Sequence, residues 1–201
     1  MERLFEKLIK NAIPELTTAE LQCISEGCVF KKLRKKELVL REGEVNKHKI
    51  FVISGLLRNF SISAIGAEHI VRFTDIGNWT IDPESYFSGL PTKYNIDAVE
   101  TTEIAMISHP VFEKLVQNIP PLRRYFGRMM TANMGMVQQR VLDAISASPE
   151  EKYIGFIKDY PGVFNRVPLH MVASYLGVSR ETLTRVRQGR DAIHRVSRLI
   201  V

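Results

Sequence analysis

The sequence predicts an α+β protein in which a β roll is followed by helices. Residues 28–108 contain short apolar runs rich in Val, Ile and Phe, and turn signals separate these runs. Helical spacing of the apolar residues begins at Pro110, and a helix–glycine–helix pattern follows near the C-terminal end. These three observations place a closed roll of jelly-roll type in the first half of the chain and an all-helical part after it.

The composition is that of a globular protein. The chain has 201 residues, of which 45% are hydrophobic and 25% charged, so it is long enough to bury a core. No apolar run reaches the ~20 residues of a membrane-spanning helix, and the charged start Met1–Lys7 does not resemble a signal peptide. We therefore expect a cytoplasmic protein with no membrane partner. The formal net charge of +6 permits a polyanionic partner but does not require one.

Two short helices are expected before the roll. Apolar residues from Leu4 to Ile13 have helical spacing, which Pro14 ends. Thr17 and Glu20 have the spacing of a capping box and open the second helix. Strands are expected at residues 28–30, 38–40, 50–53, 56–62, 69–73, 95–99 and 104–107, with turns at 42–43, 54–55, 65–67 and 76–78.

A long helix is expected after the roll. Residues 110–119 have helical spacing, Pro120 restarts a helix, and no proline interrupts residues 122–147. One stripe of this helix consists of Phe126, Met130, Asn133, Val137 and Val141. The stripe either packs on the roll or forms a two-stranded coiled coil with a second copy of the chain. The length of the helix and its smooth, Met-rich seam favour the coiled coil.

The C-terminal part has the pattern of two helices joined by a tight turn. A capping box at Ser148 opens a helix that contains residues 153–157 and ends at 159–162. A second short helix then begins at Pro168, Gly177 permits a turn, and Ser179 is expected to cap the helix that follows. From residue 179 onwards there are six arginines against two acidic residues, a local net charge of +4. The pattern alone fits an ordinary helical hairpin with a solvated charged face, but an arginine-bearing second helix favours DNA binding.

Three residues near the start of the second helix are candidates for reading bases. Arg180 and Arg185 can bond guanine bidentately, and Glu181 can accept a hydrogen bond from the cytosine amine. Further residues are expected to contact the DNA backbone or to assist: Ser179, Thr182, Thr184, Arg187, Gln188 and Arg190.

The segment 172–185 resembles the helix-turn-helix of the Crp/Fnr family of bacterial transcription regulators. Ser179 to Thr182, together with Arg185, resembles the base-reading set of the cyclic-AMP-responsive branch, in which the two arginines read guanines and the glutamate reads a cytosine. Residues 38–58 and 95–108 resemble parts of the family's cyclic-nucleotide-binding roll, and 147–168 is similar to the short members found in Bacteroidetes-type bacteria.

This resemblance implies a domain of winged-helix type after the long helix. Only residues 189–201 follow the second helix, which leaves room for one strand, such as 196–201, or a last helical turn. We therefore expect a short or missing wing. The expected division of the chain is a sensor roll with its N-terminal helices at 1–118, a connector and dimerisation helix at 119–147, and a DNA-binding domain at 148–201.

The resemblance also implies where an effector would bind. The nucleotide-binding branch needs a Gly-Glu pair and, about ten residues later, an arginine that neutralises the cyclic phosphate. Here no arginine lies between Arg72 and Arg123, and Lys93 is the only basic residue near the expected site. An effector of other chemistry, or none, fits this stretch at least as well as a cyclic nucleotide. The candidate pocket residues are Asp82, Glu84, Thr92 and Lys93.

No metal cofactor is expected. Cys23 and Cys28 are too few for an iron–sulfur cluster, which takes four thiolates, and we interpret both as buried structural cysteines. The five histidines are scattered without ligand spacing, so neither haem nor another metal is expected. Trp79 and Tyr86 fit either the lining of a pocket or the core, and their place next to strands favours the core.

The sequence thus favours a homodimeric DNA-binding regulator that acts on an inverted-repeat operator, with RNA polymerase as a further candidate partner. The alternative is a roll that binds a cyclic nucleotide or another small molecule and whose main output is not DNA binding. An enzyme is not expected, because the sequence has no phosphate-binding glycine loop, no nucleophile elbow and no metal-binding helix motif.

Overall fold

The computed structural model describes the backbone of residues 1–199 and the side chains of residues 1–189. The chain divides into two compact units, Met1–Asn133 and Met134–Val201. The helices of the first unit are α1 (Glu2–Ala12), α2 (Thr18–Glu26), α3 (Pro83–Ser88), α4 (His109–Asn118) and the first half of α5 (Pro120–Ser146). Its strands are β1 (Cys28–Leu33), β2 (Leu38–Leu40), β3 (His48–Ser54), β4 (Leu56–Ile62), β5 (Glu68–Asp75), β6 (Trp79–Thr80), β7 (Asn95–Ala98) and β8 (Thr102–Ser108).

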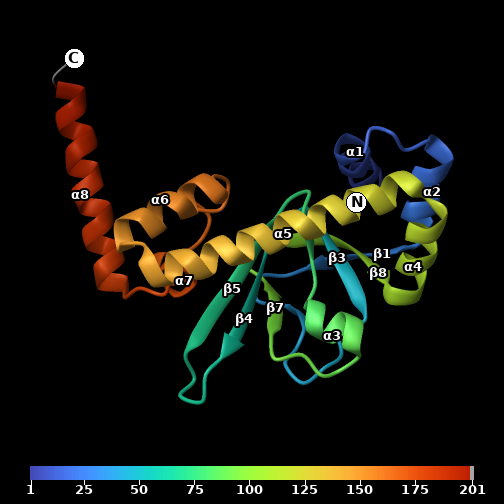
Figure 1. The fold of residues 1–201 in the computed structure, drawn as a ribbon, viewed down its shortest axis with the longest axis horizontal. Helices are drawn as coiled ribbons and strands as arrows, with labels where there is room; N and C mark the ends of the chain where they lie inside the picture. Colours follow the sequence, from blue (N-terminus) through green and yellow to red (C-terminus); the bar gives the residue numbers. More distant parts are fainter. Residues whose placement is uncertain (200–201) are drawn as a thin grey trace. The chain divides into compact units, whose positions relative to one another are not determined.

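The strands form two four-stranded antiparallel sheets, with the orders β1-β8-β3-β6 and β2-β7-β4-β5. Strands that are neighbours in sequence often lie in different sheets, which is the arrangement of a jelly roll. The predicted roll is therefore confirmed. The sequence reading missed the two-residue strand β6 and the short helix α3, which lies at the edge of the roll in Figure 1.

The space between the sheets is filled by aliphatic side chains. Leu33, Val52, Leu57, Ile96 and Ile104 belong to one buried cluster, and none of them is exposed to solvent. They come from strands of both sheets, so burial of this cluster holds the two layers face to face.

A second cluster lies under the helices and is rich in aromatic rings. Phe51 of β3 lies 5.3 Å from Phe5 of α1 and 4.9 Å from Trp79 of β6, measured between ring centroids. Phe126 of α5 lies 5.3 Å from Trp79 and 4.7 Å from Phe112 of α4. These contacts attach α1, α4 and the first half of α5 to the roll. Trp79 is a core residue, as the sequence reading expected.

The structure corrects two predictions that the sequence makes for single residues. Phe126 was assigned to a dimer seam, but it is only 8% exposed and belongs to the core of the roll. The helical spacing of a stripe does not distinguish a core contact from a contact with a second copy. Cys23 was interpreted as buried but is exposed, whereas Cys28 is partly buried.

A buried arginine joins three strands of the second sheet. The Arg58 guanidinium of β4 donates two hydrogen bonds to the Asp97 carboxylate of β7, at 2.8 and 3.0 Å, and it also bonds Glu68 of β5. Burial opposes the charge of this guanidinium, but the bonds to Asp97 and Glu68 outweigh it and raise the pKa of Arg58. The bidentate geometry ties these strands through side chains as well as backbone.

The second unit contains the end of α5 together with α6 (Pro149–Asp159), α7 (Leu169–Leu176) and α8 (Arg180–Leu199). Its core is aromatic: Phe156 of α6 lies 5.3 Å from both the Tyr160 and the Tyr175 ring. The predicted capping box at Ser148 is present, as is the one at Thr17 in the first unit.

Of the two alternatives for the C-terminal end, the described residues show the helical one. α8 continues as a helix to Leu199, while residues 200 and 201 of the expected strand lie outside the described part of the chain. Over the described residues, no helix combines the length and the apolar character that crossing a bilayer requires.

Gly55 should be the glycine of the roll that tolerates substitution least. Its φ is +89°, and an added Cβ would lie 2.6 Å from the Thr101 carbonyl oxygen and 2.7 Å from Thr102 Cα. At Gly66 the φ is +81°, but nothing lies within 4 Å of the added atom. We expect Gly66→Ala to lower the free energy of unfolding by about 1 kcal/mol, and Gly55→Ala by about 3 kcal/mol or more. Urea denaturation of both variants measures the difference, and equal losses would contradict this account.

Candidate functional site

The α7–turn–α8 segment forms the predicted helix–turn–helix. α7 ends at Leu176, and the Gly177 that follows has a φ of +66°, in the left-handed region that favours glycine. The Val178 N–H then donates to the Ala173 carbonyl at 3.1 Å, which closes the turn. The Ser179 hydroxyl accepts a hydrogen bond from the Thr182 N–H at 3.1 Å and so caps α8.

The inward face of this segment is apolar. Val172 and Ala173 of α7 and Leu183 and Val186 of α8 are all buried. Ala173 is a small residue that is only 3% exposed, and Leu183 is fully buried. The four inward residues fix which side of α8 faces solvent.

The three expected base-reading residues are exposed at the start of α8. Arg180, Glu181 and Arg185 all present their side chains to solvent. The backbone N–H of Glu181 and the Ser179 hydroxyl hold the pKa of the Glu181 carboxyl below its usual range, with a smaller contribution from the Arg180 charge. The residue is therefore an anion at neutral pH and a good hydrogen-bond acceptor.

The residues expected to contact the DNA backbone or to assist differ in their exposure to solvent. Ser179, Arg187 and Gln188 are exposed, and the Arg187 guanidinium lies 5.4 Å from the Phe164 ring centroid. Thr182 and Thr184 are partly buried, and the Thr184 hydroxyl donates to the Arg180 carbonyl at 2.8 Å. The Arg190 side chain lies outside the described side chains.

The remaining stripe residues of α5 have different surroundings. Asn133 accepts a hydrogen bond from Arg72 of β5 at 3.3 Å, so it is engaged with the roll. Met130, Val137 and Val141 are 59%, 63% and 56% exposed. These three apolar side chains are therefore available to a partner.

The four expected effector residues lie in two pairs. The Thr92 hydroxyl donates to the Asp82 carboxylate at 2.6 Å, and both side chains are buried. The Asp82 carboxylate also caps α3 by accepting from the Glu84 N–H at 3.2 Å. Glu84 and Lys93 form an exposed ion pair with the Lys93 Nζ at 3.4 Å from the carboxylate.

These residues do not fit a cyclic nucleotide. A ribose hydroxyl would need a free carboxylate, but Asp82 already accepts from Thr92 and from the α3 backbone. The cyclic phosphate would need a cation, but the residue ten positions after Asp82 is Thr92, and Lys93 faces solvent with Glu84 as its partner. These four residues therefore do not present the carboxylate and the arginine that the sequence resemblance implies for holding a cyclic nucleotide.

The cysteines do not form a metal site either. Burial raises the pKa of the Cys28 thiol to about 12, with a smaller contribution from Glu2, so this thiol stays protonated and is a poor metal ligand at neutral pH. Among the residues that the structure describes, no three His, Cys, Asp or Glu side chains gather as a metal site.

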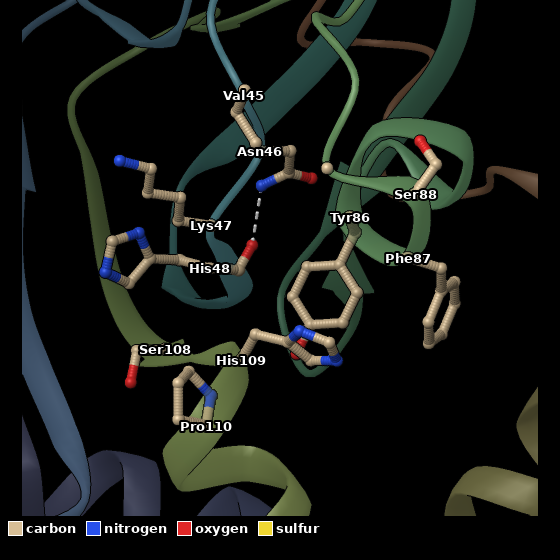
Figure 2. A pocket seen from close by; sticks show the side chains of 11 residues that line it. Val45, Asn46, Lys47, His48, Tyr86, Phe87, Ser88, Ser108, His109 and Pro110 are labelled. Carbon is tan, nitrogen blue, oxygen red and sulfur yellow. Dashed lines mark hydrogen bonds between the residues drawn. The ribbon is translucent and has the colours of Figure 1, made fainter.

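One structural position, Asn46 in Figure 2, lies beside the expected effector residues and gave no signal in the sequence. The Asn46 backbone N–H donates to the Ser85 hydroxyl at 2.9 Å, and its side-chain oxygen accepts from the Asp82 N–H at 2.7 Å. Asn46 thus holds the start of α3 in place. A single asparagine between Val45 and Lys47 fits a turn equally well, so sequence alone does not reveal this role.

Comparison with known proteins agrees with this architecture. Residues 30–119 match the cyclic nucleotide-binding domain family. The chain is 27% identical over 169 residues to the transcriptional activator protein Anr of Pseudomonas aeruginosa, covering 77% of this chain and 67% of Anr. It is 24% identical over 170 residues to the regulatory protein HlyX of Actinobacillus pleuropneumoniae, covering 78% and 69%.

Solved structures show the same fold. FixK2 of Bradyrhizobium japonicum superposes with a TM-score of 0.72 at 17% identity, covering 83% of this chain and 86% of FixK2. A Crp/Fnr family regulator of Eubacterium rectale superposes with a TM-score of 0.66 at 18% identity, covering 90% and 88%. Residues 30–119 thus form a roll that matches the cyclic nucleotide-binding domain family. The chain as a whole is similar to transcription regulators such as Anr and has the fold of solved Crp/Fnr family structures.

Two glycines of the second unit should respond to alanine with opposite signs. Gly177→Ala places a Cβ in the left-handed region and should lower the free energy of unfolding by about 1 kcal/mol. Gly155 lies inside α6 with nothing within 4 Å of an added Cβ, so Gly155→Ala should raise stability by about 0.5–1 kcal/mol. Thermal unfolding of both variants tests the turn. A neutral Gly177→Ala would refute the strained conformation.

Proposed function

We propose that this protein is a homodimeric transcription regulator that inserts α8 into the major groove of an inverted-repeat operator and is controlled through its N-terminal roll. The observation that carries this proposal is the exposure of Arg180, Glu181 and Arg185 on the first turns of a helix whose other face is packed on α7. The relatives, which include a transcriptional activator, support regulation of transcription rather than catalysis.

The chemistry of these three side chains suits base edges. Arg180 and Arg185 each offer a planar fork of donors, which matches the O6 and N7 acceptors of guanine. Glu181 is held as an anion and accepts from a cytosine amine. Ser179, Arg187 and Gln188 are exposed on the same helix start or its next turns and suit phosphate contacts. This geometry favours DNA over a roll with another output.

An unpaired apolar stripe on α5 supports the dimer. Met134, Val137, Val141 and Ile145 are 62%, 63%, 56% and 81% exposed, and they follow one another at helical spacing. An apolar stripe of this kind is energetically unfavourable in water and matches the seam of a two-stranded coiled coil. Two copies would supply two recognition helices for half-sites about 34 Å apart.

Substitution of the base-reading arginines should relax the choice of sequence. Arg180→Ala or Arg185→Ala should weaken binding to a selected operator by about 1–3 kcal/mol and reduce discrimination at one base pair. Arg41→Ala, an exposed arginine of the roll, is the control with the same loss of charge. Operator selection from random DNA, followed by titration at fixed salt, measures both effects. Unchanged affinity and specificity in Arg180→Ala would refute the assignment.

A charge in the apolar stripe should separate the protomers. Val137→Glu places a carboxylate in the proposed seam and should shift the protein to monomer, with loss of operator binding. Gln138→Glu adds the same charge at the next exposed position of α5 and should leave the dimer intact. Sedimentation equilibrium measures both variants. A dimeric Val137→Glu protein would exclude this seam.

A further inference from the structure

Arg140, near the C-terminal end of α5, contacts α7 in two ways. Its guanidinium Nη2 donates a hydrogen bond to the Tyr175 carbonyl at 3.1 Å, and its Cζ lies 4.0 Å from the centroid of the Tyr175 ring. Both residues belong to the second unit of the chain. A planar guanidinium can stack on a ring while its N–H groups donate elsewhere, which a lysine ammonium cannot do. The contact therefore depends on arginine in particular.

The carbonyl that Arg140 bonds belongs to the last turn of α7. Because α7 ends at Leu176, the helix itself supplies no N–H for the Tyr175 carbonyl. The C-terminal end of a helix also carries a partial negative charge, which favours a cation beside it. Arg140 thus caps α7 from a different helix, directly before the turn at Gly177 that leads into α8.

The Tyr175 ring is itself held in the core of the second unit. Its centroid lies 5.3 Å from that of Phe156 and 5.5 Å from that of Tyr160. Large aromatic side chains pack in few geometries, so this ring has little freedom to move. Arg140 therefore joins α5 to a fixed part of the helix-turn-helix rather than to a mobile side chain.

The contact lies on the same turns of α5 as the exposed apolar stripe. Arg140 directly precedes Val141 and follows Val137 by three residues, and both valines are more than half exposed. Successive side chains of an α-helix are turned by about 100°, so Arg140 projects from the flank of the stripe and not from its centre. A partner copy on the stripe would leave the contact with Tyr175 intact.

A series of rigid contacts thus leads from the proposed dimer seam to the recognition helix. The stripe places α5 against its copy, and Arg140 fixes α7 on α5. The buried side chains of Leu183 and Val186 fix α8 on α7. In a dimer with two-fold symmetry, the same contacts occur twice, so they determine how far apart the two copies of α8 lie.

We propose that Arg140 is a positioning residue that sets the separation of the two recognition helices, and with it the spacing of the operator half-sites that the protein accepts. The proposal rests on the proposed function, since it requires a dimer through the α5 stripe and DNA binding through α8. One added base pair moves a half-site by about 3.4 Å and rotates it by about 34°. A rigid attachment of α7 to α5 makes such a change unfavourable, whereas a loose attachment tolerates it.

The test compares the wild type with Arg140→Lys, which keeps the charge and loses the planar stack. Operators obtained by selection are lengthened or shortened by one base pair at their centre. The wild type should bind each altered operator at least about tenfold more weakly, because one half-site is then out of register. For Arg140→Lys the corresponding loss should be less than about threefold. Arg123→Lys, an exposed arginine of α5, should discriminate like the wild type.

Two further measurements separate positioning from support of the fold. Binding to a duplex with a single half-site should be the same for Arg140→Lys and the wild type, because the helix-turn-helix itself is intact. Without DNA, deuterium uptake by residues 174–183 should be faster in Arg140→Lys than in the wild type, since α7 has lost its cap. Arg123→Lys should leave the uptake unchanged.

Three results would overturn the proposal while leaving the proposed function standing. They are wild-type spacer discrimination in Arg140→Lys, unchanged deuterium uptake in that variant, and a loss of its single half-site binding, which would show that Arg140 only supports the fold. A selection that yields no inverted-repeat operator for the wild type would refute the proposed function and this proposal together.

Discussion

The contact between Trp79 and Phe126 is the interaction on which the arrangement of the first unit depends. It joins the shortest strand of the roll to the longest helix, with the two ring centroids 5.3 Å apart. Phe51 lies on the other side of Trp79, and Phe112 packs against Phe126. Because large aromatic side chains bury much apolar surface and pack in few geometries, this cluster fixes where α5 begins and where α4 can lie against the roll.

Local chemistry explains why so much of the fold could be predicted from the sequence. The capping boxes at Thr17 and Ser148, the proline at position 120 and the left-handed turn at Gly177 each depend on a few neighbouring residues. The strands of the roll were found because their β-branched runs are bounded by turn residues. β6 was missed because a two-residue strand has no periodicity, and it is held by pairing with β3 rather than by its own sequence.

The predictions that were wrong share one physical cause. Tertiary contacts decide whether a side chain is buried, and these contacts cannot be seen in the local sequence. Phe126 and Val137 occupy the same helical stripe, yet the first is in the core and the second is exposed. Lys49 stands in an otherwise apolar run and gives no sign that four aromatic rings surround its ammonium. The exposed side chains of α8 were easier to predict, since exposure on an amphipathic helix follows directly from the positions of Leu183 and Val186.

The hydrogen bond between Asp82 and Thr92 makes the segment between them a closed loop. The backbone of Thr92 is also hydrogen-bonded to residues 43 and 44. Its N–H donates to the Glu44 carbonyl, and its carbonyl accepts from the Gly43 N–H. A net contribution of about 1 kcal/mol per bond means that opening this loop requires only a few kcal/mol. The segment from 82 to 92 is therefore held at its end by both the side chain and the backbone of Thr92.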